Sequence, residues 1–79
     1  MDIKLYQQYL NEFVRNAVRQ SNGSVQGTAE RLHELEIKGI FVSHREEKRR
    51  ALADAQRAFD DHRHWPMEII ISHLGISID

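Results

Sequence analysis

The sequence predicts a small, mainly α-helical domain of three or four helices. Two observations support this prediction. Apolar residues recur at three- and four-residue spacing along the chain, which places them on one side of a helix. Residues typical of helix starts and stops stand at the ends of these stretches. The 79 residues leave room for one helical domain, residues 1–79, and we expect a partner subunit to stabilise a chain that buries so little surface alone.

The first helix is expected over residues 3–20. Its apolar residues share one face and are Leu5, Tyr6, Tyr9, Leu10, Phe13, Val14, Ala17 and Val18. Asp2 can accept hydrogen bonds from the free amides at the start of the helix. Asn22 and Gly23 supply the left-handed backbone that ends a helix. This is the most clearly marked element of the chain.

The next stretch predicts a second helix followed by an apolar segment. Ser24 can cap a helix that runs to about residue 36. Gly27 lies in its first turn, and this glycine indicates either a close approach to the backbone or a frayed helix end. Residues 37–42 are rich in β-branched and aromatic side chains, which is typical of a short strand or a hydrophobic turn. A short β pairing of this segment with residues 75–78 is a further option.

A long helix is predicted after this segment. Ser43 and Glu46 have the spacing of a capping box, so the helix should begin at Ser43 and run to about His62. It carries a narrow apolar stripe, built mostly of alanine, that lets another helix approach closely. The stripe consists of Ala51, Leu52, Ala55, Ala58 and Phe59.

Residues 66–75 fit two structures. Three consecutive isoleucines are typical of a buried strand. Pro66 at the start, Glu68 in the first turn and Gly75 at the end favour a short helix, because these signals agree with one another. This apolar segment and the long helix should contact either the core or a second subunit. The residues assigned to such an interface are Leu52, Phe59, Trp65, Met67 and Ile70.

Composition excludes several classes of function. Lys and Arg number 11 and Asp and Glu 12, so the chain is not a strongly basic protein that grips nucleic acid through its overall charge. The lack of cysteine excludes disulfides and thiolate chemistry. No apolar run resembles a signal peptide or a membrane span, so we expect a cytoplasmic protein.

No residue pattern indicates an enzyme or a metal site. His62, His64 and His73 lack the spacing of metal ligands. Asp60 and Asp61 diverge on a helix instead of facing each other across a cleft. We therefore expect neither catalytic residues nor a metal or other cofactor.

One stretch carries a functional signal. Asn22-Gly23-Ser24-Val25, followed by Thr28-Ala29-Glu30-Arg31-Leu32-His33, resembles the first half of the C-terminal DNA-binding module of PucR/CdaR-type bacterial regulators and, more loosely, Fis-type helix-turn-helix domains. The resemblance implies DNA binding and transcriptional control, and we expect a homodimer bound to double-stranded DNA. In those families the recognition helix follows at once, whereas residues 37–42 intervene here, and a tight helix-turn-helix joins its helices by about 3–4 residues.

If the long helix is the DNA reader, its polar stripe identifies the contacts. About 100° per residue places Arg45, Arg49, Gln56 and Arg63 beside the apolar face. Arginine pairs with guanine or phosphate and glutamine with adenine, and Thr28 could reach a phosphate from its helix start. A solvated face crossed by salt bridges is the alternative interpretation of this stripe.

A second function fits the same composition. The chain could be a small protein-interaction module, such as an adaptor or inhibitor, that binds a larger protein through an apolar helical surface. Salt separates the two hypotheses, because contacts to phosphates weaken steeply with salt and hydrophobic interfaces do not.

Overall fold

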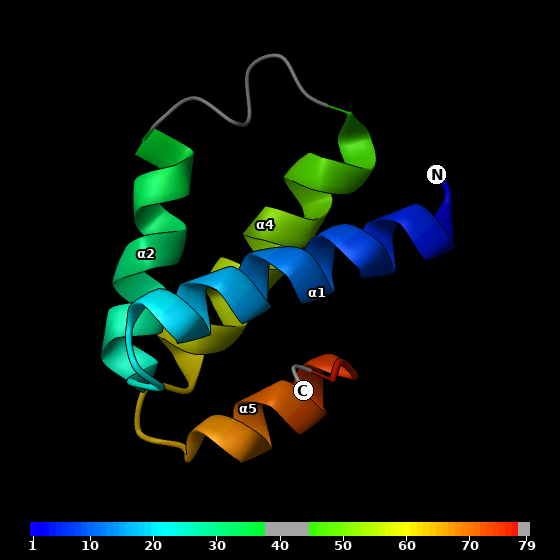
Figure 1. Ribbon diagram of the computed structural model, residues 1–79. Helices are drawn as coiled ribbons and strands as arrows, with labels where there is room; N and C mark the ends of the chain where they lie inside the picture. Colours follow the sequence, from blue (N-terminus) through cyan, green and yellow to red (C-terminus); the bar gives the residue numbers. More distant parts are fainter. Residues whose placement is uncertain (38–44, 78–79) are drawn as a thin grey trace.

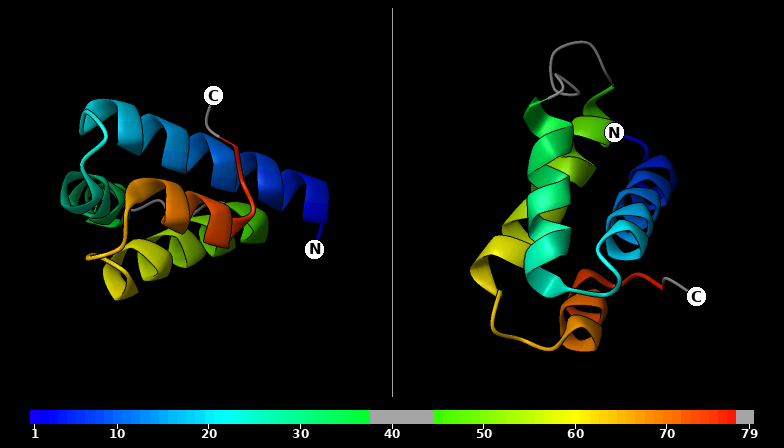
Figure 2. Two further views of the ribbon diagram at one scale, coloured as in Figure 1. Left: turned by 90° about the horizontal axis from the view of Figure 1, so that it is seen from below. Right: turned by 60° about the vertical axis from the view of Figure 1, so that its left-hand side comes forward.

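The computed structural model describes residues 1–37 and 45–77, and this part of the chain folds into helices that share one core (Figure 1). They are α1 (Ile3–Gln20), α2 (Val25–Ile37), α4 (Glu46–Asp61) and α5 (Met67–Leu74). α1 lies across α2 and α4 and contacts both, and α2 also contacts α4 (Figure 1). The short helix α5 packs on α4 (Figure 2). The predicted small, mainly α-helical fold is confirmed.

The expected β pairing has no counterpart in the described residues, which include no strand. Residues 75–77 follow α5 without forming one. The other half of the expected pairing is residues 37–42, of which Ile37 belongs to α2. Residues 38–42 lie outside the described part of the chain.

α1 begins and ends where its sequence signals predict. The Asp2 carboxylate accepts a hydrogen bond from the Leu5 amide at 3.2 Å, which satisfies one of the free donors of the first turn. After Gln20 the backbone passes through φ values of 55° at Asn22 and 82° at Gly23. Gly23 adopts this conformation without the steric cost that a side chain would add. The turn directs α2 back across α1.

α2 begins with the predicted cap and a close helix contact. The Ser24 hydroxyl accepts from the Gly27 amide at 3.0 Å. A Cβ atom added at Gly27 would lie 2.8 Å from Cβ of Ser21, much closer than atoms of this kind pack. Of the two explanations for Gly27, the structure therefore supports a close approach to the backbone, and the glycine lets α2 start directly against the end of α1.

α4 begins later than the capping box predicts. Arg45 is the N-cap, with φ −58° and ψ 152°, and Glu46 is the first helical residue. A helix beginning at Ser43 is wrong, because the extended backbone at Arg45 separates the helix from that serine. Ser43 itself lies outside the described residues. The alanine-rich stripe of α4 is buried throughout, as expected.

The helical interpretation of residues 66–75 is confirmed. Pro66 is the N-cap of α5 rather than its first helical residue, and Gly75 ends the helix with φ 71°. The amides of Gly75 and Ile76 donate to the carbonyls of Ser72 and Ile71 at 3.0 and 3.4 Å, which satisfies carbonyls that a helix end leaves free. Ile70 and Ile71 are buried, so α5 closes one end of the core.

Candidate functional site

Thr28, predicted to contact a phosphate, lies in the interior. Its side chain has 0% exposure. Its hydroxyl donates to the Ser24 carbonyl at 2.7 Å and lies 2.8 Å from the Ser21 hydroxyl. These hydrogen bonds hold the turn between α1 and α2 and leave Thr28 no surface for DNA. The predicted phosphate contact of Thr28 is therefore corrected to a structural role.

Gln56 is also buried, with 8% exposure. Its side-chain amide donates to the Leu32 carbonyl of α2 at 2.9 Å. The side chain thus joins α4 to α2 inside the protein and cannot reach an adenine. The assignment of Gln56 to a DNA-facing stripe is corrected for this reason.

The three predicted arginines remain on the surface but do not form one patch. Arg45 and Arg49 are exposed at the first turn of α4. Arg63 follows the other end of this helix, and its guanidinium donates to Asp60 at 3.1 Å. Asp60 also lies 2.7 Å from His33. Arg63 therefore belongs to a charge network between α2 and α4, away from the other two arginines.

Most of the residues assigned to an interface belong to the core of this chain. Leu52, Phe59 and Ile70 each have 0% exposure, so none of them presents surface to a second subunit, and their interface assignment is corrected to core packing. Trp65 and Met67 are half-buried against the same core. The Trp65 ring stacks on His62, with ring centroids 3.7 Å apart.

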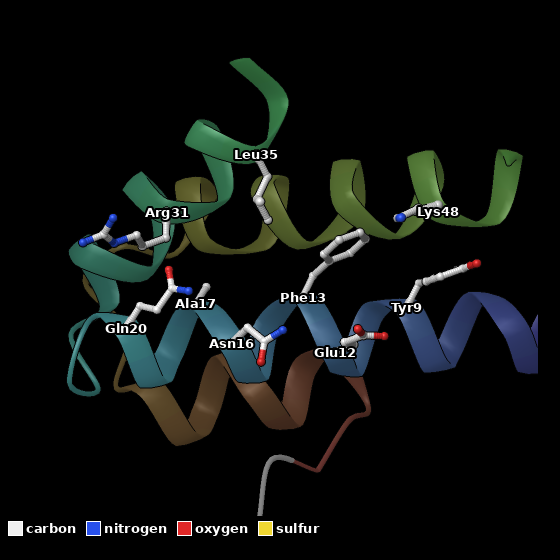
Figure 3. A pocket seen from close by; sticks show the side chains of 9 residues that line it. All are labelled: Tyr9, Glu12, Phe13, Asn16, Ala17, Gln20, Arg31, Leu35 and Lys48. Carbon is white, nitrogen blue, oxygen red and sulfur yellow. The ribbon is translucent and has the colours of Figure 1, made fainter. Parts of the chain in front are cut away.

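A groove lies where α1, α2 and α4 converge (Figure 3). Its floor is apolar and consists of Phe13 and Ala17 of α1 and Leu35 of α2. Tyr9 stacks against Phe13, with ring centroids 6.3 Å apart, and extends this apolar surface along α1. Phe13 and Ala17 are 9% and 3% exposed. We call this feature the α1/α2/α4 groove.

The two sides of the α1/α2/α4 groove differ in charge. Glu12, Asn16 and Gln20 line the α1 side, and Arg31 and Lys48 stand on the α2 and α4 side (Figure 3). The Lys48 ammonium lies 5.6 Å from the centre of the Tyr9 ring, a distance at which the ring face attracts a cation. An apolar floor between polar sides is the chemistry of a surface that binds apolar side chains.

Arg31 has an intramolecular partner that a ligand could replace. Its guanidinium lies 3.1 Å from the carboxylate of Glu34, one turn away on α2, and both side chains are about half exposed to solvent. Exposed pairs of this kind contribute only about 0–1 kcal/mol because water and salt screen them. A carboxylate bound in the groove could therefore pair with Arg31 at little cost.

The size of the groove favours side chains over a cofactor. Its volume is about 210 Å³, below the roughly 300–1,000 Å³ of small-molecule sites. Within residues 1–37 and 45–77, no group of three or more His, Cys, Asp or Glu side chains is arranged to hold a metal ion. The groove thus presents apolar and charged side chains in a space smaller than a typical small-molecule site.

A second, polar pocket lies between α1, α4 and α5. The Tyr6 hydroxyl donates to the Asp54 carboxylate at 2.5 Å, and Asp61, His62 and His73 line the same pocket. Burial and, after it, the hydrogen bond to Asp54 together raise the pKa of Tyr6 from its ordinary 10.0 to about 12. The hydrogen bond ties the start of α1 to the middle of α4.

The Tyr6 phenol should give a titration step of its own. Because folding raises the pKa of Tyr6, the neutral phenol stabilises the fold below pH 10, and this contribution is lost as the pH rises from 10.0 to about 12. The ultraviolet absorbance of tyrosinate should therefore show a late step near pH 12 that the Tyr6→Phe variant lacks. A late step that persists in Tyr6→Phe would show that this tyrosine is not its source.

Glu47 joins α4 to the chain start. Its carboxylate accepts from the Asp2 amide at 2.9 Å and lies 3.6 Å from the Arg45 guanidinium. The hydrogen bond from Asp2 lowers the pKa of Glu47, with its own amide and Arg45 acting in the same direction. The stabilising contribution is present at neutral pH and is lost as the pH falls through this lowered pKa.

No family model, no curated protein and no solved structure matches the chain. None of the helices in the described residues is long and apolar enough to cross a membrane. The resemblance to helix-turn-helix regulators stays a prediction.

The groove residues were missed in the sequence because they belong to three helices. Tyr9 and Phe13 stand four residues apart at the edge of the apolar stripe of α1, beside the polar Glu12 and Asn16. This neighbourhood of aromatic and polar side chains was the sequence signal for the groove. Leu35 and Lys48 join them only through the packing of α2 and α4 on α1.

Proposed function

We propose that this protein is a small protein-interaction module whose partner binds in the α1/α2/α4 groove. The observation that carries the proposal is the apolar floor of Phe13, Ala17 and Leu35 between polar sides. Interfaces of this design bind apolar anchors of a partner at the centre and satisfy polar groups at the rim. The module contributes a preformed surface, so binding requires little reorganisation of its backbone.

The placement of the predicted DNA contacts favours this function over DNA binding. Thr28 and Gln56 are buried and engaged in hydrogen bonds within the protein. Arg63 is paired with Asp60. A helix that reads the major groove of DNA needs several side chains directed at base edges from one face. Of the predicted set, only Arg45 and Arg49 at the start of α4 remain for that role.

Blocking the groove should abolish partner capture. Asn16 is exposed on the groove side of α1, so Asn16→Arg places a long side chain over the floor without altering the core. We expect captured partner from lysate of the source organism to fall at least about tenfold, a loss typical of an obstructed binding hot spot. Quantitative mass spectrometry of material bound to the immobilised protein measures this loss.

Gln7→Arg is the matched control for this experiment. Gln7 is exposed on the same helix and does not line the groove, and the substitution adds the same charge. The Gln7→Arg variant should capture the same proteins in the same amounts as the unmodified chain. If Asn16→Arg and Gln7→Arg capture the same proteins in equal amounts, the groove is not the binding site.

DNA binding is a second candidate, favoured by the exposure of Arg45 and Arg49 at the start of α4. On this hypothesis, binding to random-sequence duplex DNA should fall steeply as salt is raised and should be lost in an Arg45→Ala/Arg49→Ala variant, since both arginines would contact phosphates. Fluorescence anisotropy across a salt series measures both effects. A folded protein that leaves DNA unbound at low salt would eliminate this candidate.

A further inference from the structure

We infer that the groove receives an acidic amphipathic α-helix of another protein, which lies along α1 with its carboxylates toward Arg31 and Lys48. This inference rests on the proposed function and specifies the chemistry of the partner. It follows from the shape of the groove, from the difference in charge between its sides and from the surface that a second copy of this chain could offer.

The shape and the surrounding backbone favour a helix. The groove follows α1 from Tyr9 to Gln20, and a rise of 1.5 Å per residue gives a length of about 17 Å, or about three helical turns. An extended peptide usually binds by adding a strand to a free sheet edge, and the described residues include no strand that could offer one. A helix satisfies its own backbone groups and needs only side-chain contacts.

The charges set the orientation of this helix. Arg31 and Lys48 stand at opposite ends of the α2 and α4 side, and Glu12 stands on the α1 side (Figure 3). Two carboxylates on one flank of the bound helix could pair with the two cations. A cation or amide on its other flank would suit Glu12. The opposite charges on the two sides of the groove thereby specify which flank of the bound helix is acidic and in which direction the helix runs along α1.

A second copy of this chain is a poor occupant. An inserted helix must present an apolar stripe, with anchors three, four and seven residues apart. The apolar faces of α1, α4 and α5 are buried in their own core. The exposed large hydrophobic side chains of the described residues are Met1, Ile3 and Ile69, which lie at the chain start and on α5. The described helices of a second copy therefore offer no free apolar stripe, and we assign the inserted helix to a different protein.

Two synthetic helical peptides test the inference. Both carry leucines at positions i, i+4 and i+7, and one carries glutamates and the other lysines on the flank that faces Arg31 and Lys48. We expect the unmodified protein to bind the acidic peptide about tenfold more tightly, which corresponds to two exposed ion pairs. Fluorescence anisotropy measures the affinities, and shifts of the amide signals of Phe13, Asn16 and Leu35 in NMR spectra locate the site.

Charge reversal provides the decisive comparison. In an Arg31→Glu/Lys48→Glu variant the preference should change to the lysine peptide. Arg50→Glu/Arg57→Glu is the matched control, because both residues are exposed on α4 and neither lines the groove. This variant should keep the preference for the acidic peptide. Circular dichroism verifies that both variants retain the helical content of the unmodified protein.

The possible failures separate this inference from the proposed function. Equal binding of both peptides at the groove would contradict the inference that the partner is acidic, while it would still support the proposed interaction module. If neither peptide shifts the groove signals, the helical acidic partner is wrong, and the capture experiment with Asn16→Arg judges the module independently. A preference that the control variant also reverses would assign the effect to overall charge rather than to Arg31 and Lys48.

Discussion

Replacing Phe59 with alanine should lower the free energy of unfolding by about 3–5 kcal/mol, the usual cost of removing a buried phenylalanine. The ring has 0% exposure and is among the largest fully buried side chains of the core. A domain of 79 residues has a total stability of roughly 4–12 kcal/mol. We therefore expect Phe59→Ala to lose a large share of the stability of the domain, as measured by urea unfolding followed by circular dichroism.

Ile69→Ala is the control for this prediction. Ile69 is 49% exposed on α5, so its truncation leaves no cavity and should cost less than about 1 kcal/mol. A Phe59→Ala variant that is as stable as Ile69→Ala would contradict the position of the ring at the centre of the core.

Replacing Gln56 with glutamate should destabilise the protein by about 3 kcal/mol at neutral pH, the scale of an uncompensated buried charge. The substitution keeps the shape of the side chain but removes the donor that contacts the Leu32 carbonyl at 2.9 Å. A carboxylate would then face a carbonyl oxygen with little access to water. Acid pH should restore part of the lost stability, because the protonated glutamic acid side chain can again donate a hydrogen bond.

Urea unfolding at neutral and acid pH measures this effect, with Gln7→Glu as the control. Gln7 is exposed on α1, so the same change there should alter stability by about 0.5 kcal/mol or less. Equal stability of the two variants at neutral pH would mean that Gln56 does not form the contact between α4 and α2.

Local signals in the sequence predicted most of the fold. The cap at Asp2, the left-handed turn at Asn22-Gly23 and the cap at Ser24 each act on residues only a few positions away. Short segments were therefore enough to predict α1 and the start of α2. The proline and glycine that flank α5 are local in the same sense. The prediction that α4 begins at Ser43 was wrong, because the backbone is extended at Arg45 and the helix begins only at Glu46.

The site was harder to predict because it depends on contacts between distant helices. A helical wheel placed Gln56 next to the apolar stripe of the long helix, and a polar residue outside that stripe was expected to face solvent. Both α1 and α2 pack on α4, so its buried face is wider than that stripe and includes Gln56 and Glu47. Thr28 was misplaced for a related reason, since its hydroxyl is enclosed by the turn that joins α1 to α2.

Site-specific photo-crosslinking in the source cell tests the proposed groove most directly. A photoreactive amino acid at Asn16 lies in the groove, and the same group at Gln7 lies on α1 away from it. We expect irradiation to give a discrete protein adduct from position 16 and none from position 7. Adducts of equal yield from both positions, or adducts with nucleic acid in place of protein, would contradict the assignment of the groove as a protein-binding site.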